Sequence, residues 1–297
     1  MKEGVLGALG AQGGLGPLSD EIARQAVADV CDGLAVIGQG QRATLYRLAD
    51  GRVLKLYHPQ IPDEVVQAEY ALSQAANRAG LPSWPVHELI LEGGWRALLG
   101  DFVDGPSVSD QMRRRPWRIP RLLRALAAIQ ARLHTTPVVV EQPARLHDPK
   151  RIRGFLRGLS APLAALVERE VAAAASQGFC HGDFHGGNVL VSARGLIMID
   201  WDRAGRGPVA ADVGRTLAWL SLGPTDSRRI GKVELAFRNR LAEIYLAEYC
   251  RLTGTPPRPI LAWLMFEIVR RRREQESDPA IRRHLKHLAR RLRRAAA

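Results

Sequence analysis

Short apolar stretches separated by turn signals fill most of the first hundred residues, a pattern typical of β-strands. We expect strands at residues 35–38, 43–48 and 52–57, and two more within residues 89–102. Asp50-Gly51 predicts a tight hairpin turn before the third strand. Residues 62–76 are expected to form a helix. This part of the chain therefore predicts a small sheet that carries one main helix.

Beyond Asp104-Gly105-Pro106 the apolar positions recur with the helical period. One face of a helix within residues 122–133 carries the apolar residues Leu122, Leu126, Ile129 and Leu133. Further helices are expected at residues 151–159, 162–176, 209–222, 233–252 and 259–274. Residues 178–201 predict a strand, a loop and a second strand.

The pattern as a whole predicts an α+β fold with a small, antiparallel, β-rich N-lobe and a larger helical C-lobe. We place a loose leader at residues 1–18, the N-lobe at residues 19–103, and the C-lobe at residues 104–297, with a hinge near residue 103. The leader is glycine-rich and lacks the charged start and the apolar run of a signal peptide.

The composition excludes several classes of protein. Hydrophobic residues make up 46% of the 297 residues, which is enough for a sizeable core. No run of about 18 apolar residues predicts a transmembrane helix. The three cysteines Cys31, Cys180 and Cys250 are too far apart to favour a disulfide framework or a zinc site. Cytoplasmic localisation is the expectation that fits these observations.

The charge is unevenly distributed along the chain. The net charge of +13 divides into −3 over residues 1–100 and +16 over the remainder. A basic half favours anionic partners, and nucleotide phosphates, a membrane surface and nucleic acid all satisfy that preference. Residues 279–294 predict a basic C-terminal helix, which either docks through its apolar stripe or contacts an anionic surface.

Residues 180–202 carry the clearest chemical signal. They read CHGDFHGGNVLV and then, after a short turn, LIMIDWD. Asp183, Asn188 and Asp200 lie at the ends of short apolar stretches in this segment. Phosphoryl transfer needs a base that orients the hydroxyl, oxygen ligands for a metal ion and a cation that neutralises charge. Carboxylate and amide oxygens suit Mg²⁺.

This segment resembles the catalytic loop of the aminoglycoside phosphotransferase and choline kinase superfamily, in which His-Gly-Asp precedes the Asn. The likeness spans roughly residues 35–270 and implies the two-lobed protein-kinase-like fold. It implies that Asp183 is the catalytic base, that His181 braces the loop, and that Asn188 and Asp200 hold Mg²⁺. Asp200 lies in an Asp-Trp-Asp sequence where protein kinases have Asp-Phe-Gly. ATP or GTP is the implied co-substrate.

Lys55 lies within the apolar strand at residues 52–57, where a charge is costly unless it is paired. Only five of the 43 basic residues are lysines, so a lysine here suggests a need for a compact point charge. The resemblance makes it the lysine that grips the nucleotide phosphates. Glu69 in the following helix is the expected partner and Glu64 the reserve. The alternative is a solvent-facing strand lysine.

The resemblance also assigns three further sets of residues. Gly38 and Gly40 occupy the position of the hairpin that covers the phosphates, although a third glycine is missing. In the hinge at residues 98–103, the backbone of Asp101 and Val103 is expected to contact the adenine. Asp212 is expected to receive amide hydrogens of the catalytic loop, the alternative being an ordinary acid in the first turn of a helix.

We therefore expect a phosphotransferase that moves the γ-phosphate of ATP or GTP to a hydroxyl of a small molecule. An aminoglycoside-type acceptor is the default for the family, with acidic residues such as Glu267, Glu274, Glu276 and Asp278 as candidate carboxylates for a polycation. A neutral or anionic metabolite is the close alternative, because a lobe of charge +16 repels polycations.

Three alternatives belong to other functional classes. A protein Ser/Thr kinase needs a longer segment after Asp200 than the roughly ten residues that precede the next predicted helix. A non-catalytic nucleotide-binding scaffold would be expected to lack one of the charged residues, and none is missing. A nucleic-acid-binding protein would depend on the basic C-terminal helix alone. No obligate protein partner is inferred.

Overall fold

The fold was analysed in a computed structural model that describes residues 34–91, 95–144, 160–172, 177–223 and 232–274, with Gly154 and Leu156. Contacts between residues divide the chain into two compact units. The first comprises the residues up to Asn77 together with Trp84–Val103, and the second comprises Arg78–Ser83 and the residues from Asp104 onward. The expected leader and the expected C-terminal helix lie outside the described residues.

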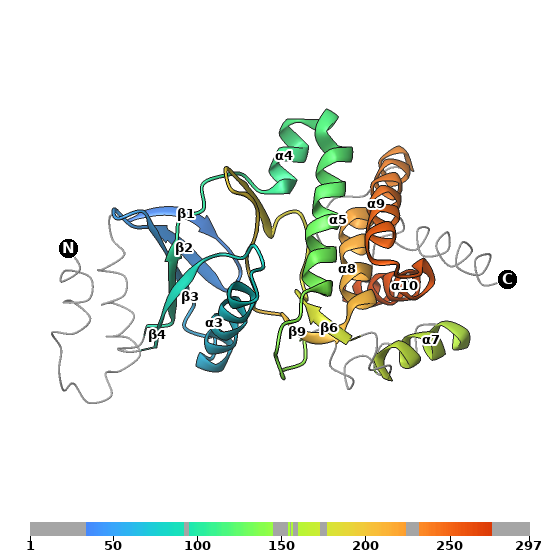
Figure 1. Ribbon diagram of the computed structural model, residues 1–297, viewed down its shortest axis with the longest axis horizontal. Helices are drawn as coiled ribbons and strands as arrows, with labels where there is room; N and C mark the ends of the chain where they lie inside the picture. The colour runs from blue at the N-terminus through green and yellow to red at the C-terminus, as the bar shows by residue number, and fades with distance from the viewer. Residues whose placement is uncertain are drawn as a thin grey trace. The chain divides into compact units, whose positions relative to one another are not determined.

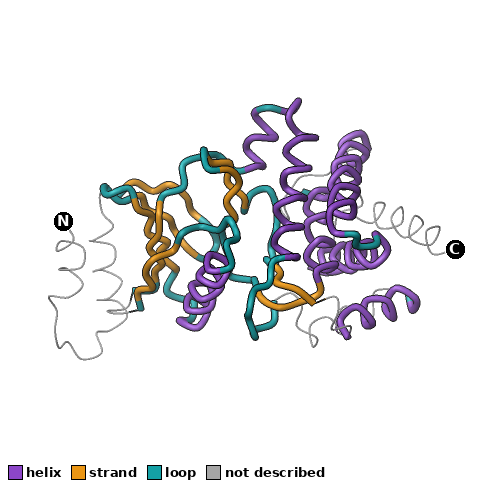
Figure 2. Tube along the Cα trace, viewed as in Figure 1, coloured by secondary structure: helices purple, strands orange, loops and turns teal. Residues whose placement is uncertain are grey.

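A five-stranded antiparallel sheet forms the first unit (Figures 1 and 2). Its strands are β1 (Ala35–Gln39), β2 (Ala43–Arg47), β3 (Arg52–Tyr57), β4 (Val86–Ile90) and β5 (Ala97–Asp101), in the order β1-β2-β3-β5-β4. Gly51, with φ of 83°, adopts the left-handed conformation that the turn between β2 and β3 requires. The strand register pairs Leu45 with Lys55, which fixes the face on which the lysine lies.

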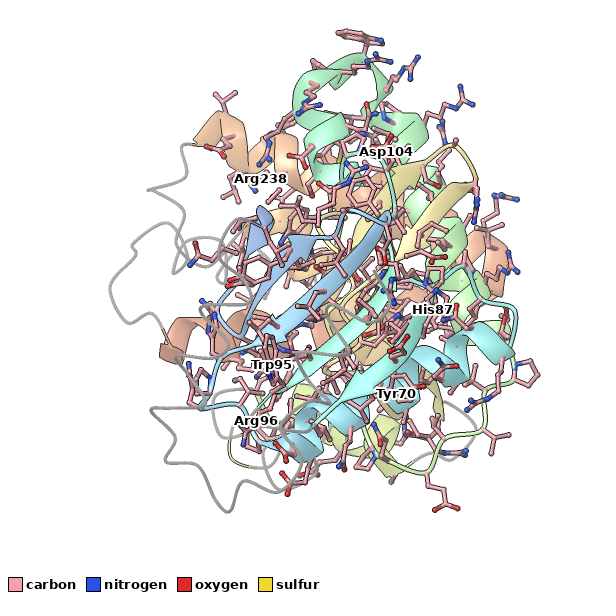
Figure 3. All side chains as sticks on the ribbon, turned by 90° about the vertical axis from the view of Figure 1, so that its left-hand side faces the viewer. Tyr70, His87, Trp95, Arg96, Asp104 and Arg238 are labelled. Atoms are coloured by element: carbon pink, nitrogen blue, oxygen red, sulfur yellow. The ribbon has the colours of Figure 1, made fainter. Side chains whose placement is uncertain are left out.

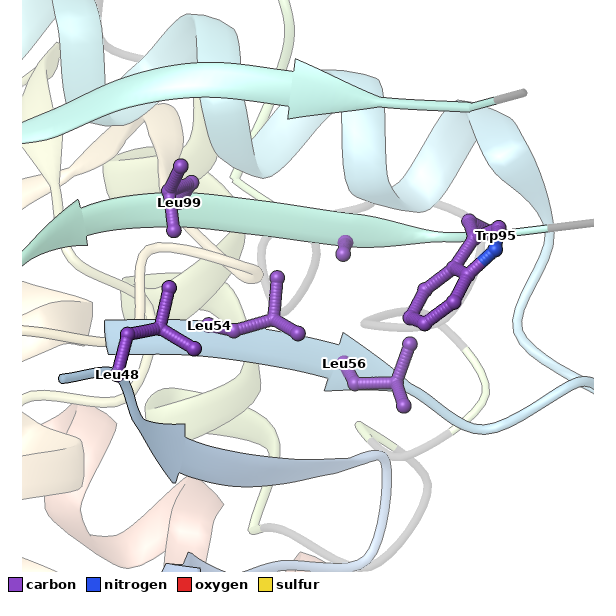
Figure 4. Close-up of a cluster of buried hydrophobic side chains, with 6 residues drawn as sticks. Leu48, Leu54, Leu56, Trp95 and Leu99 are labelled. Carbon is purple, nitrogen blue, oxygen red and sulfur yellow. The ribbon is translucent and has the colours of Figure 1, made fainter. Parts of the chain in front are cut away.

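Alternate residues of the central strands build an apolar face on this sheet. Leu54 pairs with Leu99 and Leu56 with Ala97 across β3 and β5. These four residues form one buried cluster with Leu48 and Trp95 (Figure 4). Because side chains alternate along a strand, Lys55 points to the opposite face from Leu54 and Leu56.

Helix α3 (Asp63–Arg78) is held against the second half of this unit by its polar side chains. Gln74 Nε2 donates to the carbonyl oxygen of Val86 at 2.6 Å. The hydroxyl of Tyr70 donates to the carbonyl oxygen of His87 at 3.3 Å (Figure 3). The helix begins with Asp63 and Glu64 and ends with Arg78, which matches the direction of its dipole. Glu69 lies on its buried side.

The second unit is built mainly of helices (Figure 2). They are α4 (Val108–Arg114), a 3₁₀ turn η1 (Pro116–Arg118), α5 (Ile119–Thr135), α7 (Ala161–Ala172), α8 (Val209–Leu222), α9 (Lys232–Thr253) and α10 (Pro257–Glu274). Helix α8 packs against both α9 and α10, and α5 packs against α9. None of the helices that the structure describes is both long and apolar enough to span a membrane.

Two short, two-stranded antiparallel sheets complete the second unit, and only the second of them is a hairpin of consecutive strands. Strand β6 (Gln177–Cys180) pairs with β9 (Gly205–Pro208), and β7 (Val189–Ser192) pairs with β8 (Gly195–Met198). Residues 181–188 connect β6 to β7, and residues 199–204 connect β8 to β9. The predicted catalytic motif therefore occupies both connections, and the strands fix where each connection begins and ends.

Most elements lie where the sequence places them, and the differences have local causes. Helix α4 and strand β9 were not expected. Ser107 caps α4 by accepting the N–H of Asp110 at 3.0 Å, a local bond that starts a helix of seven residues. Helix α5 starts three residues earlier than expected because Pro120 is tolerated in a first turn. Most of the helix expected at residues 151–159 lies outside the described residues.

Candidate active site

Lys55 is paired within the first unit. Its Nζ lies 2.6 Å from Oε1 of Glu69, whose side chain is fully buried, and the hydroxyl of Tyr57 donates to Oε2 of the same carboxylate. The structure thus brings Lys55 together with Glu69, while Glu64 is exposed at the start of α3. A buried carboxylate that meets both a cation and a hydroxyl holds the lysine in one position. Tyr57 was not singled out in the sequence.

Two further segments of this unit were predicted to contact the nucleotide, the turn after Gly38 and the hinge at Asp101, and backbone hydrogen bonds hold both. Gly38 lies in β1, and the N–H of Gly40 donates to the carbonyl oxygen of Ala43 at 2.9 Å, which closes the turn. Asp101 donates its N–H to Pro85 at 3.0 Å, and its carbonyl oxygen accepts the indole N–H of Trp84 at 2.8 Å. The backbone groups of Asp101 are therefore already bonded, although a carbonyl oxygen can accept a second donor.

Asp212 fixes the start of the loop between β6 and β7. The N–H groups of His181 and Gly182 donate to its Oδ2 and Oδ1 at 3.1 and 2.7 Å. Gly182 has a φ of 77°, and a Cβ there would lie 2.1 Å from the carbonyl oxygen of Arg203. Only glycine fits this conformation and this contact. The structure brings Asp212 to the loop as the sequence suggested, on the first turn of α8.

Asp212 is itself held by two neighbours on α5. Gln130 Nε2 donates to Oδ2 at 3.1 Å, and His134 Nε2 lies 3.1 Å from the same oxygen. Among the described residues, His134, Asp212 and Cys180 form one group whose ligand-type atoms lie within 4.8 Å of one another. His134 Nδ1 is bonded to Tyr249 and Cys180 Sγ to the carbonyl oxygen of Gly207. These atoms are therefore engaged in hydrogen bonds, and the group is a brace for the loop.

The two loop histidines make hydrogen bonds within and beside the loop. His181 Nε2 lies 3.0 Å from the carbonyl oxygen of Ile199, which can only accept, so Nε2 carries the proton. His185 Nδ1 accepts the N–H of Gly187 at 3.0 Å, and its ring stacks on Trp219. Burial lowers the pKa of His185 to about 4, with the charge of Asp183 opposing this shift in part. Both rings support the loop.

Asp183 lies at the centre of the loop between two guanidinium groups. Nε and Nη2 of Arg215 lie 3.0 and 2.9 Å from the same oxygen, Oδ1. Nη1 of Arg203 lies 3.5 Å from the other oxygen, Oδ2. Burial raises the pKa of Asp183, but the charges of Arg215 and Arg203 outweigh burial and lower it to about 2. The carboxylate is therefore ionised at neutral pH, and about a fifth of its side chain is exposed, 21%.

Asn188 and Asp200 lie at the same end of the β7–β8 hairpin. Val189 pairs with Met198, and the N–H of Ile199 donates to the carbonyl oxygen of Asn188 at 3.0 Å. Asn188 Nδ2 donates to the carbonyl oxygen of Asp183 at 3.0 Å, which leaves its amide oxygen as the acceptor. Asp200 has a φ of 67°, the one positive value at a non-glycine residue among those described. An amide oxygen and a carboxylate are hard ligands and fit Mg²⁺.

Arg215 belongs to a buried ionic network that the sequence reading missed. Its Nη1 lies 3.5 Å from Glu267 Oε2 on α10, and Arg270 Nη2 lies 2.8 Å from that oxygen. Glu267 is therefore paired, although it was a candidate for binding a cationic acceptor. The available signal was a lone arginine in the apolar helix at residues 209–222, where a charge needs a partner.

Comparison with known proteins agrees with this geometry. Residues 33–259 match the phosphotransferase enzyme family, and the chain belongs to that family. No curated protein matches it. An aminoglycoside phosphotransferase structure from Streptomyces rimosus shares 18% identity and a TM-score of 0.57, covering 85% of this chain and 99% of its own.

Two other kinases have the same fold. Choline kinase from Cryptosporidium parvum shares 12% identity and a TM-score of 0.56, covering 90% of this chain and 94% of its own. An amicoumacin kinase in complex with AMP-PNP and Ca²⁺ shares 15% identity and a TM-score of 0.57, covering 93% and 96%. At these identities the likeness shows the fold. The superfamily and the fold class expected from the sequence are thereby confirmed, and the family is one of kinase-type enzymes.

Proposed function

We propose that this protein transfers the γ-phosphate of ATP, or of GTP, to a hydroxyl group of a small molecule. In this reaction the acceptor oxygen forms a bond to the γ-phosphorus while the bond from that phosphorus to the bridging oxygen breaks, which releases the nucleoside diphosphate. The hydroxyl proton passes to Asp183 and then to solvent. The chemistry is mainly positioning and charge stabilisation, so the rate depends on how rigidly the reacting groups are held.

The arrangement around Asp183 is the observation that carries this proposal. Asp212 holds the loop through two backbone N–H groups, and Arg215 holds one carboxylate oxygen of Asp183. The other oxygen, Oδ2, has only the long Arg203 contact among the described residues and is the group that suits an acceptor hydroxyl. An ionised carboxylate with one oxygen fixed and one accessible can orient a hydroxyl for attack.

Lys55, with Glu69 behind it, is the residue we assign to the nucleotide phosphates. Asn188 and Asp200 would hold Mg²⁺, which would neutralise the charge that develops on the phosphates during transfer. The complex of the similarly folded amicoumacin kinase with AMP-PNP and Ca²⁺ supports the use of a nucleotide and a divalent cation. Gly38, Gly40 and Val103 keep their assignment to nucleotide binding.

A neutral or anionic acceptor is favoured over a polycation by the charges at Asp183. Two guanidinium groups, those of Arg215 and Arg203, contact this carboxylate. Glu267, one of the candidates for binding an amine, is buried and paired with Arg215 and Arg270. A cationic amine would therefore meet arginines beside the base. The aminoglycosides and amicoumacin of the family comparisons remain the second class of acceptor to test.

Initial rates with separate acceptor classes test this proposal. Purified protein is incubated with Mg·ATP and, in turn, amino sugars, sugar alcohols and sugars, amino alcohols, nucleosides and acidic sugars, and ADP formation is followed. The expected result is acceptor-dependent ADP formation that is strongest with a neutral or anionic class. Strongest turnover with polycationic amino sugars would contradict the acceptor assignment. ADP formation that no acceptor increases would contradict the transferase proposal itself.

A further inference from the structure

We infer that Arg215 is the positioning residue for the catalytic carboxylate, that Glu267 holds Arg215 in place, and that Oδ2 of Asp183 receives the acceptor hydroxyl. This inference rests on the proposed function and adds residues to it. The motif at residues 180–202 contains neither Arg215 nor Glu267.

The two contacts from Arg215 converge on one oxygen. Nε lies 3.0 Å and Nη2 2.9 Å from Oδ1 of Asp183, both within hydrogen-bonding distance. Two charge-assisted donors on Oδ1 oppose rotation of the carboxylate and occupy that oxygen. Oδ2 is left with the Arg203 contact at 3.5 Å, which is too long for a strong hydrogen bond. Oδ1 of Asp183 therefore anchors the carboxylate, and Oδ2 is the oxygen that can accept the substrate hydroxyl.

Arg215 is itself fixed by its surroundings. It lies in the buried helix α8, and only 10% of its side chain is exposed. Glu267 on α10 is 4% exposed, and its Oε2 lies 3.5 Å from Arg215 Nη1, so the two form a buried ion pair and not a strong hydrogen bond. A buried cation that meets two carboxylates has little freedom to move, because leaving either one exposes an unpaired charge in a desolvated site. The Arg215 guanidinium on α8 therefore holds Asp183, and Glu267 on α10 pairs with that guanidinium.

The same helix fixes both the loop and its carboxylate. Asp212 and Arg215 are three residues apart on α8 and so lie on neighbouring parts of one face. Asp212 accepts the loop N–H groups before Asp183, and Arg215 donates to the Asp183 carboxylate. Thr216, the next residue, donates its hydroxyl to the carbonyl oxygen of Phe184 at 2.9 Å. One rigid element thus sets the backbone and the side chain of the base together.

Steady-state kinetics of four variants test the inference. Arg215→Met removes both donors, Arg215→Lys keeps a charge but loses the paired geometry, and Glu267→Gln weakens the support. Arg270→Met is the matched control, since it removes a partly buried guanidinium from the same carboxylate, Glu267. Each variant is assayed for kcat, for KM of both substrates and for Tm, with the acceptor that the wild type uses.

The expected result is a loss of kcat with little change in nucleotide binding. Arg215→Met should lower kcat by about 10- to 100-fold, the loss that follows from misplacing a catalytic group by about 1 Å, while KM for ATP changes by less than about twofold. Arg215→Lys should recover part of kcat, and Glu267→Gln should lose less than Arg215→Met. Arg270→Met should lower kcat by less than about threefold.

Two results would overturn the inference. Arg215→Met with the kcat of the wild type would show that Asp183 needs no such support. A Tm loss shared equally by Arg215→Met and Arg215→Lys, with kcat per folded molecule unchanged, would show a structural role only. A wild type that transfers phosphate to no acceptor would instead remove the proposed function, and this assignment with it, so the two failures are distinguishable.

Discussion

Asp212 accepts the backbone N–H of Gly182 at 2.7 Å, and this bond ties helix α8 to the start of the loop that contains Asp183. The carboxylate also accepts from His181 and from Gln130, and it is fully buried. His134 Nε2 also lies within hydrogen-bonding distance, so four groups converge on the Asp212 carboxylate. An acceptor with two oxygens and no hydrogens suits this position, because every neighbour offers a donor.

Asp212→Asn should therefore destabilise the protein and slow the reaction. An amide replaces one acceptor oxygen by an NH₂ group that opposes a donor, which leaves buried polar groups unsatisfied. The expected loss in the free energy of unfolding is about 1–3 kcal/mol. Urea denaturation measures it, and kcat should fall at temperatures where the variant is still folded. A variant with the stability and kcat of the wild type would show that Asp212 does not hold the loop.

Gly182→Ala should be more damaging than Gly195→Ala. Both glycines have positive φ, 77° and 106°, so both substitutions incur the cost of that conformation, about 1–2 kcal/mol. Only at Gly182 would the new Cβ also meet backbone, 2.1 Å from the carbonyl oxygen of Arg203, whereas at Gly195 nothing lies within 4 Å. The extra overlap should add about 1–3 kcal/mol. Equal losses of stability in the two variants would contradict the close packing of the loop.

Lys55→Met should weaken nucleotide binding. The variant removes the cation assigned to the phosphates and the charge that lies 2.6 Å from the buried Glu69 carboxylate. We expect the Kd for Mg·ATP to rise by about tenfold or more, which corresponds to about 1.4 kcal/mol. Arg52→Met on the same strand is the control, because Arg52 pairs with Asp50 at the hairpin turn. Calorimetric titration measures both, and equal Kd values for Lys55→Met and the wild type would contradict the assignment.

Asn188→Ala and Asp200→Ala should raise the Mg²⁺ concentration needed for half-maximal activity. Each variant removes one hard oxygen ligand from the end of the β7–β8 hairpin, and we expect a shift of about tenfold or more. Ser192→Ala, in the turn at the other end of this hairpin, is the control, since the Ser192 hydroxyl bonds within the turn, to Gly195 and Arg194. Activity measured as a function of Mg²⁺ concentration at constant ATP distinguishes the two ligand variants from the control. Identical Mg²⁺ curves for all four proteins would show that the ion binds elsewhere.

The elements and the motif could be predicted because their signals are local. Residues 180–202 are contiguous, so Asp183, Asn188 and Asp200 fall on two connections whose flanking strands are visible as short apolar stretches. The pairing of Lys55 with Glu69 joins one strand to the next helix, fourteen residues away. An apolar strand that contains one lysine is itself a signal for a partner.

The ionic network could not be predicted because its partners are distant in sequence. Arg215 lies 32 residues after Asp183, and Glu267 lies 52 residues after Arg215. Helical periodicity placed α8 and α10 correctly, but it does not tell which face of one helix meets the other. Only the packing of α8 against α10 shows that Glu267 supports Arg215 and is not an open carboxylate for a cationic acceptor.

Phosphoryl transfer by the loop around Asp183 is tested most directly by following the γ-phosphate of ATP. ATP labelled in the γ-phosphate is incubated with Mg²⁺, pooled hydroxyl acceptors and either the wild type or Asp183→Asn, and the labelled products are separated. We predict that the wild type moves the label into an organic phosphate and that the variant does so at least about 100-fold more slowly. Label that stays in ATP, or that appears at equal rates with both proteins, would contradict the account.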